Sequence, residues 1–331
     1  MGYGRRFGNT SKATLGMGFA ALALAVVPAS AQDKYPSKPV KLVVGFAAGG
    51  PADIVARVLG AKLSESLGQQ FVIENRGGAG GTIATEAVGR ADPDGYTLLM
   101  SPIANAVNES MYKNRRIKVG PDLMAVTSVA ETANVLVVHS SLGVKSVAEL
   151  IALAKSMPGD LVYATAGRGS ATHLASELFD LMAGIKMRPV HYKGGGETIK
   201  DLLTGEVKVM FSSIAPVLGF IREGKMLGIA TTGLKRDATL PELPTVAEAG
   251  LPGFDVRLWL GVLAPAKTPN AIVERLSAET GKALATADMK KTLGAQGFEP
   301  QISTPAAFDQ FYRSEVEKWA KVVAATGMVG D

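Results

Sequence analysis

Residues 42–99 read LVVGFAAGGPADIVARVLGAKLSESLGQQFVIENRGGAGGTIATEAVGRADPDGYTLL, and this stretch decides the fold class. Apolar runs typical of strands alternate in it with glycine-rich turns and helical patterns. Backbone N–H groups in the first turn of a helix lack internal partners, and the helix dipole places about half a positive charge there. Glycines before a helix start therefore suggest an anion site, and a carboxylate is the first ligand to consider.

The segment 51–67 predicts a helix that covers a sheet. Its apolar residues recur at spacings of three and four, while Arg57, Lys62 and Glu65 take the opposite face. Similar helices alternate with apolar β-rich runs along the rest of the chain, which predicts an α/β fold. Continuous apolar strands favour a mostly parallel sheet buried on both faces. Strands are expected at 40–46, 70–75, 96–101, 124–130, 134–140, 161–167, 187–193, 207–213, 227–233 and 256–264.

The first 31 residues have the features of a secretory signal peptide. Three basic residues precede an apolar core at 15–27, and Ala29-Ser30-Ala31 provides small residues for cleavage before Gln32. That core is shorter than the roughly 20 residues of a membrane span. Arg5 and Arg6 leave export by the twin-arginine route open beside the general route. We therefore predict a periplasmic protein with a cleaved signal peptide.

The composition excludes several classes of function and site. Three of the 35 basic residues lie in the predicted signal peptide, which leaves 32 beside the 30 acidic ones. With 6% aromatic residues and no basic run, the mature chain has no nucleic-acid footprint. It has no cysteine, which excludes disulfides and thiolate metal sites.

The sequence offers little support for catalysis. The three histidines are scattered, and neither a HExxH zinc motif nor a GxSxG nucleophile elbow is present. In GGAGGT, Ile83 stands where a dinucleotide-binding loop needs its third glycine. We predict no enzyme, no cofactor and no metal. An exported α/β hydrolase or lyase stays an alternative, to be supported if His173 bonded both a carboxylate and a serine.

Four loops at strand ends are candidates for a ligand site, and each also has an ordinary structural interpretation. AAGGPAD (47–53) is also a tight turn in which Asp53 interacts with the helix dipole. GGAGG (77–81) is a second nest of N–H groups or a loop braced by neighbouring side chains. In TAGRGSATH (165–173), Ser170 or Thr172 caps a helix, whereas Arg168 is suited to grip a carboxylate or to remain a solvated surface charge.

HYKGGG (191–196) forms the last glycine junction. Tyr192 is placed to line a pocket and Lys193 to attract an anion or to remain a surface charge. Ser212, in MFSSIAP, ends a further strand and is either a ligand contact or an ordinary capping hydroxyl.

Long segments in order from Tyr35 to the C-terminus resemble the Bug-type solute receptors of tripartite tricarboxylate transporters. They are YPSKPVKLVVGFAAGGPAD, ENRGGAGGTIATEAVGRADPDGYTLL, YATAGRGSATHLASELF, YKGGGETIKDLLTGEV and LPTVAEAGLPGF.

The resemblance implies a two-lobed periplasmic binding protein of the type II, Venus-flytrap class, with crossovers near Thr132 and Asp255. Lobe 1 would comprise residues 32–132 and 255–331, and lobe 2 residues 133–254. A small carboxylate would bind between them, and the closed receptor, expected to be a monomer, would dock on membrane permease subunits. The implied ligand-binding residues are Phe46, Ala47, Ala48, Gly49, Gly50, Pro51, Asp53, Ser101, Thr165, Gly167, Arg168, Gly169, Ser170, Thr172, His173, Tyr192, Lys193, Gly194 and Ser212.

Three departures from the family pattern bear on the ligand. Gly45 replaces a frequent proline, Arg168 a frequent small polar residue, and Ser212 a frequent aspartate. Without that aspartate a buried ammonium would lack a partner, so we predict a ligand without an amine. Arg168 suggests a dicarboxylate, and the apolar segment SPIANAV (101–107) leaves room for an aromatic carboxylate. A receptor that presents its carboxylate to a membrane signalling protein would have the same cleft, and it remains an alternative.

Overall fold

A computed structural model describes Met1 and residues 35–112, 115–192 and 195–330. Residues 35–331 form one compact unit. The predicted signal peptide, its arginine pair and its cleavage site lie outside the described residues, as do Lys193 and Gly194. Within the part of the chain that is described, no helix is both long and apolar enough to span a bilayer.

Strands and helices alternate along most of the chain, as the sequence predicts. The strands are β1 (Val40–Val44), β2 (Phe71–Asn75), β3 (Thr97–Pro102), β4 (Leu123–Val138), β5 (Val162–Thr165), β6 (Arg188–His191), β7 (Val209–Ser213), β8 (Leu227–Thr231), β9 (Arg257–Pro265) and β10 (Glu299–Pro300). The helices are α1 (Pro51–Leu67), α2 (Thr82–Gly89), α3 (Ile103–Met111), α4 (Val147–Ser156), α5 (Ala171–Ala183), α6 (Gly195–Thr204), α7 (Ile214–Arg222), α8 (Asn270–Ala285), α9 (Ala287–Ala295) and α10 (Pro305–Thr326). Two short 3-10 turns, η1 (Ala79–Gly81) and η2 (Ser140–Leu142), complete them.

The strands join in the order β2-β1-β3-β9-β4-β7-β5-β6, with β10 and β8 also paired to β4. Among the described strands, β1 pairs in parallel with β2 and β3, and β5 with β6 and β7. All pairings of β4 and β9 are antiparallel. The expectation of a mostly parallel sheet is therefore wrong. A continuous apolar run reports burial on both faces, and β4 and β9 are buried in this way without being parallel.

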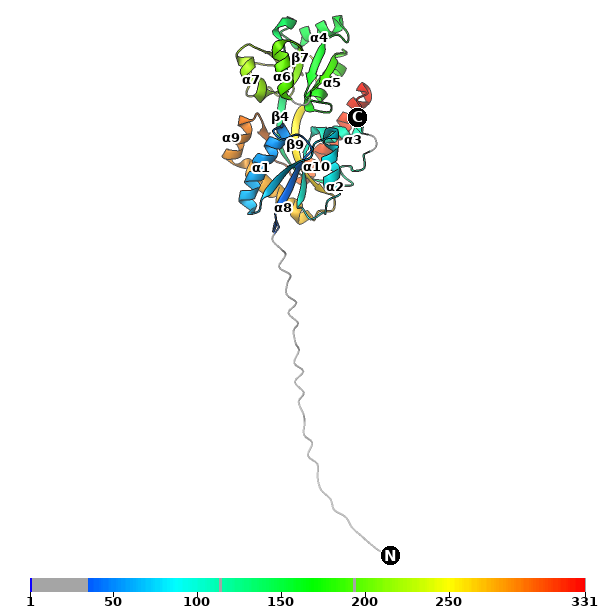
Figure 1. Cartoon of the computed structure of the whole chain (residues 1–331), viewed down its shortest axis with the longest axis vertical. Coiled ribbons are helices and arrows are strands. Elements are labelled where there is room, and N and C mark those ends of the chain that lie inside the picture. Colours follow the sequence, from blue (N-terminus) through cyan, green and yellow to red (C-terminus); the bar gives the residue numbers. More distant parts are fainter. Residues whose placement is uncertain (2–34, 113–114, 193–194, 331) are drawn as a thin grey trace. The chain divides into compact units, whose positions relative to one another are not determined.

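β4 connects the two ends of the sheet. The runs predicted as separate strands at 124–130 and 134–140 belong largely to this one strand of 16 residues. Its first part, as far as Ala133, pairs with β9, and its last part, from Asn134, pairs with β7. In Figure 1, β4 and β9 run between a group containing α4 to α7 and a group containing α1, α2, α8, α9 and α10.

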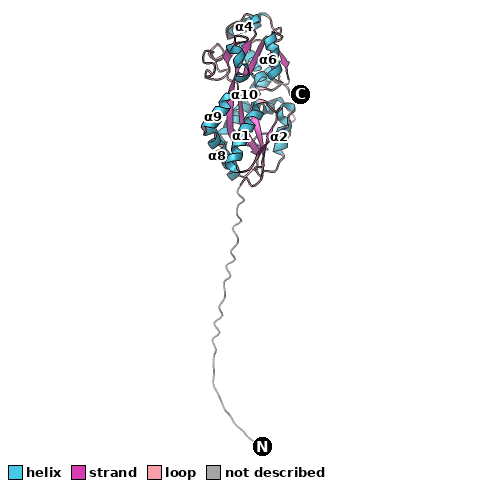
Figure 2. Ribbon diagram, turned by 60° about the vertical axis from the view of Figure 1, so that its left-hand side comes forward, coloured by secondary structure: helices cyan, strands magenta, loops and turns pink. Residues whose placement is uncertain are grey.

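Helices pack on both halves of the sheet, which explains the apolar strands. α1 lies against β1, β2 and β3, whereas α5 lies against β5 and β7. Figure 2 shows helices on the outside of the strands. α10 packs on α3 and β4 and buries Phe308, Tyr312 and Trp319. Burial of aromatic side chains from the last helix ties the C-terminal segment to the half of the sheet built by the first residues.

Candidate functional site

The loop AAGGPAD connects β1 to α1 and exposes its backbone. Ala47, Ala48 and Gly49 are exposed, and Gly49 has a φ of 78°, which suits glycine. α1 begins after Gly50, with Pro51 at its start, and no side chain caps this end of the helix. Free N–H groups at a helix start attract anions. The exposed loop and the uncapped helix start are the local geometry on which the predicted anion site depends.

The side chain of Asp53 stabilises the AAGGPAD loop through hydrogen bonds. Its carboxylate is buried, and Oδ2 accepts hydrogen bonds from Gly49 N (2.8 Å) and Arg57 Nε (2.9 Å). Oδ1 accepts one from Asn75 Nδ2 (2.9 Å), which also donates to Phe46 O (3.1 Å). Burial raises the pKa of Asp53, but the hydrogen bonds from Arg57, Gly49 and Asn75 outweigh it and leave the pKa below its ordinary value. Asp53 thus braces the loop.

The GGAGG loop packs against Gly45 and Phe46, the two residues that lead from β1 into AAGGPAD. A methyl group built on Gly45 would lie 2.8 Å from Gly81 Cα, so only glycine allows this approach of the two backbones. A methyl group on Gly81 would lie 3.2 Å from Phe46 Cε2. The glycine that departs from the family pattern at position 45 therefore lets the GGAGG loop approach these two residues.

Asn108, on α3, lies between the GGAGG loop and the TAGRGS loop. Its Nδ2 donates to Gly80 O at 2.8 Å. A methyl group built on Gly169 would lie 3.8 Å from both Asn108 Oδ1 and Met111 Sδ. The structure therefore places the GGAGG and TAGRGS loops on either side of one amide side chain that the sequence analysis overlooked.

Hydroxyl groups shape the TAGRGS loop from within. Thr165 is fully buried, and its Oγ1 accepts from Gly167 N (3.2 Å) and contacts His191 Nδ1 (2.9 Å). Thr172 Oγ1 accepts from Ala166 N (3.0 Å). Ser170 caps α5 by accepting from His173 N (3.3 Å). These hydroxyls stabilise the loop, as expected for capping side chains.

His173 belongs to a buried polar network under the same loop. Its Nδ1 accepts from Gly169 N (3.1 Å), so the proton of the neutral ring lies on Nε2, which faces Glu177 Oε1 at 3.5 Å. Tyr163 donates to Glu177 (2.6 Å). Burial raises the pKa of Glu177, yet hydrogen bonds from His173 and Tyr163 outweigh it and lower the pKa. In the hydrogen bonds and ion pairs found among the described residues, the His173 ring contacts the carboxylate of Glu177, and the bond to Ser170 is made by its backbone N–H.

Four other side chains predicted from the sequence differ in their exposure and in their hydrogen-bond partners. Arg168 is exposed at the loop tip. Tyr192 follows β6 and donates to Asp201 Oδ2 (2.7 Å); burial and this carboxylate raise its pKa to about 12. Ser212 is 8% exposed and donates to Ser213 O, while Ser101 is fully buried in β3.

The overlooked residues carry weak sequence signals. The i,i+4 spacing of His173 and Glu177 and of Asp53 and Arg57 would have revealed two pairs. Asn108 gives no such signal, because its partners come from distant segments. Within the described ranges, no group of three or more histidines and carboxylates is placed to hold a metal.

Comparison with known proteins decides the family. A model of the tripartite tricarboxylate transporter family receptor matches residues 55–328. The chain belongs to this receptor family. The resemblance to Bug-type receptors is confirmed, as is the α/β periplasmic binding protein fold.

Three similar proteins show how far the receptor matches its relatives in sequence and in fold. Protein BugT of Bordetella pertussis is 38% identical over 93% of the receptor and 95% of its own chain. A structure of R. palustris Rpa4515 with adipate has a TM-score of 0.80 and 35% identity, over 88% of the receptor and 98% of that chain. MatC from Rhodopseudomonas palustris with bound malate has a TM-score of 0.78 and 32% identity, over 87% of the receptor and 100% of that chain. These neighbours are solute-binding proteins, and at the level of the family the receptor is one too.

Proposed function

We propose that the receptor captures a small dicarboxylate, or an aromatic carboxylate, and delivers it to a tripartite tricarboxylate transporter permease. One observation carries the proposal: no side chain caps the start of α1, the residues before it (45–46) meet Gly81 of the GGAGG loop, and Asn108 joins that loop to the neighbourhood of Gly169 in the TAGRGS loop. Backbone N–H groups of the first loop would bind one carboxylate in place of water. The ligand-binding residues predicted from the sequence remain part of this proposal.

A ligand without an amine fits the opposite side of the site. Ser212 provides a hydroxyl where an aspartate would pair an ammonium, and this hydroxyl already donates to Ser213 O. Burying an unpaired ammonium is costly. The two related structures with adipate and malate support a diacid. Arg168 is the residue we assign to the second carboxylate, because a guanidinium binds a carboxylate through two parallel hydrogen bonds.

Delivery would depend on closure of two lobes. We assign residues 32–132 and 255–331 to lobe 1 and residues 133–254 to lobe 2. The change of partner along β4 between Ala133 and Asn134 supports this division, as does the start of β9 at Arg257. Hinge closure around a ligand is the usual mode of periplasmic receptors. The signal peptide would direct export and would be cleaved before Gln32.

A thermal-shift screen of the mature protein tests the ligand class. Dicarboxylates of four to six carbons, tricarboxylates, aromatic acids and amino acids would be compared, because a ligand of the native state raises the melting temperature with concentration. We expect shifts with dicarboxylates or aromatic acids. Shifts with amino acids alone would contradict the role given to Ser212, and no shift with any carboxylate would contradict the proposal as a whole.

A further inference from the structure

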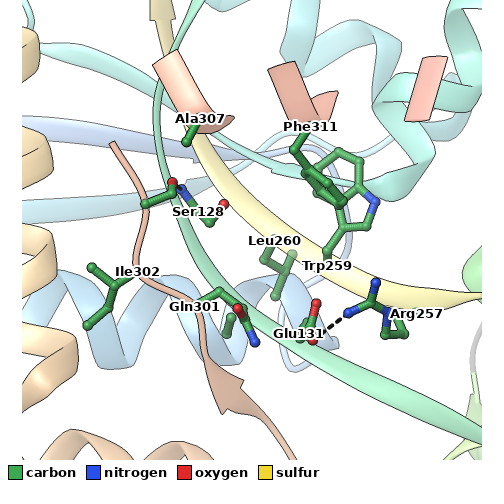
Figure 3. Close-up of a pocket in the computed structure, with 11 residues that line it drawn as sticks. Ser128, Glu131, Arg257, Trp259, Leu260, Gln301, Ile302, Ala307 and Phe311 are labelled. Carbon is green, nitrogen blue, oxygen red and sulfur yellow. Dashed lines mark hydrogen bonds and ion pairs between the residues drawn. The ribbon is translucent and has the colours of Figure 1, made fainter. Parts of the chain in front are cut away.

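A hollow lies where β4 and β9 pair in the middle of the strand order. It has a volume of about 270 Å³, and none of the residues predicted from the sequence lines it. β4 and β9 form its floor, and the segment 301–303 and the start of α10 form its rim (Figure 3). This space is large enough for a ligand of roughly ten non-hydrogen atoms, just below the usual size range of small-molecule pockets.

One wall of the hollow is aromatic. The Trp259 and Phe311 rings meet edge to face, with centroids 5.3 Å apart. Leu260, Ile302 and Ala307 extend the apolar surface (Figure 3). An aromatic wall favours a ligand with a flat apolar body, and the face of an indole also attracts a cation.

Glu131 and Arg257 line the other wall, and the charged groups beside them carry more negative than positive charge. Arg257 Nη1 donates to Glu131 Oε1 (2.7 Å), and its Nε and Nη2 donate to Asp255 (3.0 and 3.1 Å). Glu299 stands directly opposite Glu131 in the β10–β4 pair, where like charges repel. Lys318 does not offset this excess, because it pairs with Glu315 at 3.2 Å. Two carboxylates therefore bind the guanidinium of Arg257, and Glu299 adds a third carboxylate beside Glu131.

The same groups favour a cation over an anion as the ligand of the hollow. The guanidinium of Arg257 is occupied by two carboxylates, so it is poorly placed to receive an anion. Glu131 uses only Oε1 in the hydrogen bonds found among the described residues, and its side chain is 17% exposed. Burial, with Asp255 and Glu299 acting in the same direction, raises the pKa of Glu131 despite the opposing effect of Arg257. A cation beside Glu131 Oε2 would offset the repulsion between these carboxylates and would stabilise the ionised form of Glu131.

We propose that this hollow binds an organic ammonium ion with an aromatic or short aliphatic body. Its ammonium group would donate to Glu131, and its body would lie against Trp259 and Phe311. This site is separate from the proposed carboxylate site, and it touches both strands that connect the two proposed lobes.

Benzylammonium chloride is the probe, with benzyl alcohol as the neutral analogue of the same shape. The receptor has two tryptophans, so a ¹H–¹⁵N spectrum contains two indole signals, which a Trp259→Phe variant assigns. The buffer is phosphate, because amine buffers would compete. We expect benzylammonium to shift the Trp259 signal in a saturable way. Benzyl alcohol should bind with an affinity at least about tenfold lower.

Two variants of different character test the site. Glu131→Gln removes the charge with little change of shape and should weaken benzylammonium binding about tenfold. Ala307→Phe fills the hollow and should abolish the shift without altering a charge. The exposed Glu242→Gln serves as the matched control and should bind as the unmodified receptor does. Equal shifts with both probes, or unchanged affinity in the two hollow variants, would overturn the proposal, whatever the outcome of the carboxylate screen.

Discussion

At the scale of the residue, Asp53 shows how one buried carboxylate stabilises a loop through hydrogen bonds. It accepts from Gly49 N, Arg57 and Asn75, and so fixes the backbone whose N–H groups are exposed. Sequence alone predicts an acidic residue in the first turn of the helix. Gly49 and Arg57 are four residues away in the chain, whereas Asn75 reaches Asp53 only because β1 and β2 lie side by side.

Asp53→Asn should lower the free energy of unfolding by about 1–3 kcal/mol near neutral pH, because it weakens the bond to Arg57 and places a donor against Gly49 N. The pKa of Asp53 is lowered in the folded protein, so its ionised form stabilises the fold above the unfolded pKa of about 4, and this contribution is lost as the pH falls through the lower folded pKa. Urea unfolding from about pH 6 to pH 3 should show the difference between the two proteins shrinking. A constant difference would contradict this role, and the exposed Asp92→Asn is the control.

Arg168→Ala tests whether the arginine at the tip of the TAGRGS loop binds a second carboxylate. Titration calorimetry with adipate and hexanoate should show a loss of about tenfold or more for the diacid, as expected for a charge-assisted pair, and a small loss for the monoacid. Arg222→Ala, an exposed arginine at the end of α7, should leave both affinities unchanged. Equal losses for the two acids would reject a role in binding the second carboxylate.

At the scale of the element, β9 illustrates how close packing limits a strand. Gly261 pairs with Ser101 of β3 and Ser128 of β4. A methyl group built on Gly261 would lie 2.6 Å from Phe308 Cε1 of α10. The last long helix can therefore press its aromatic ring onto the strand only because residue 261 has no side chain.

Gly261→Ala should destabilise the protein by about 1–3 kcal/mol, because overpacking forces the ring and the helix to move. Thermal or urea unfolding measures this change, and Phe308→Leu in the same chain should recover part of it. Gly294→Ala is the matched control: it lies in α9 with open space around it and should be neutral or stabilising by up to about 1 kcal/mol. Equal effects of the two substitutions would exclude the proposed contact.

At the scale of the whole molecule, the order of the strands brings the candidate site together. The glycine loops follow β1, β2, β5 and β6, which lie at distant places in the strand order, with β4 and β9 between them. Local sequence pattern predicts each loop, but which loops meet depends on these two long antiparallel strands.

Closure of the two proposed lobes can be measured with dyes on cysteines, because the chain has none of its own. With dyes on Lys155→Cys in α4 and Ala285→Cys in α8, adipate should raise the energy-transfer efficiency, since binding would bring the lobes together. A pair within lobe 1, Ala285→Cys and Gln310→Cys, should not change. A similar change in both pairs, or none in the first at saturating adipate, would contradict closure.

The sequence by itself determined the α/β class, most of the helices and strands, the glycine loops and the resemblance to the receptor family, because these depend on local periodicity, turn chemistry and ordered motifs. It did not determine the direction of the central strands, since burial on both faces looks the same in parallel and antiparallel sheets. Tertiary structure alone decided that β4 is one strand with two sets of partners, that Asn108 lies between two loops, and that Glu131 and Arg257 line a hollow with Trp259 and Phe311. Such contacts join residues far apart in the chain, and no local pattern encodes which distant segments will meet.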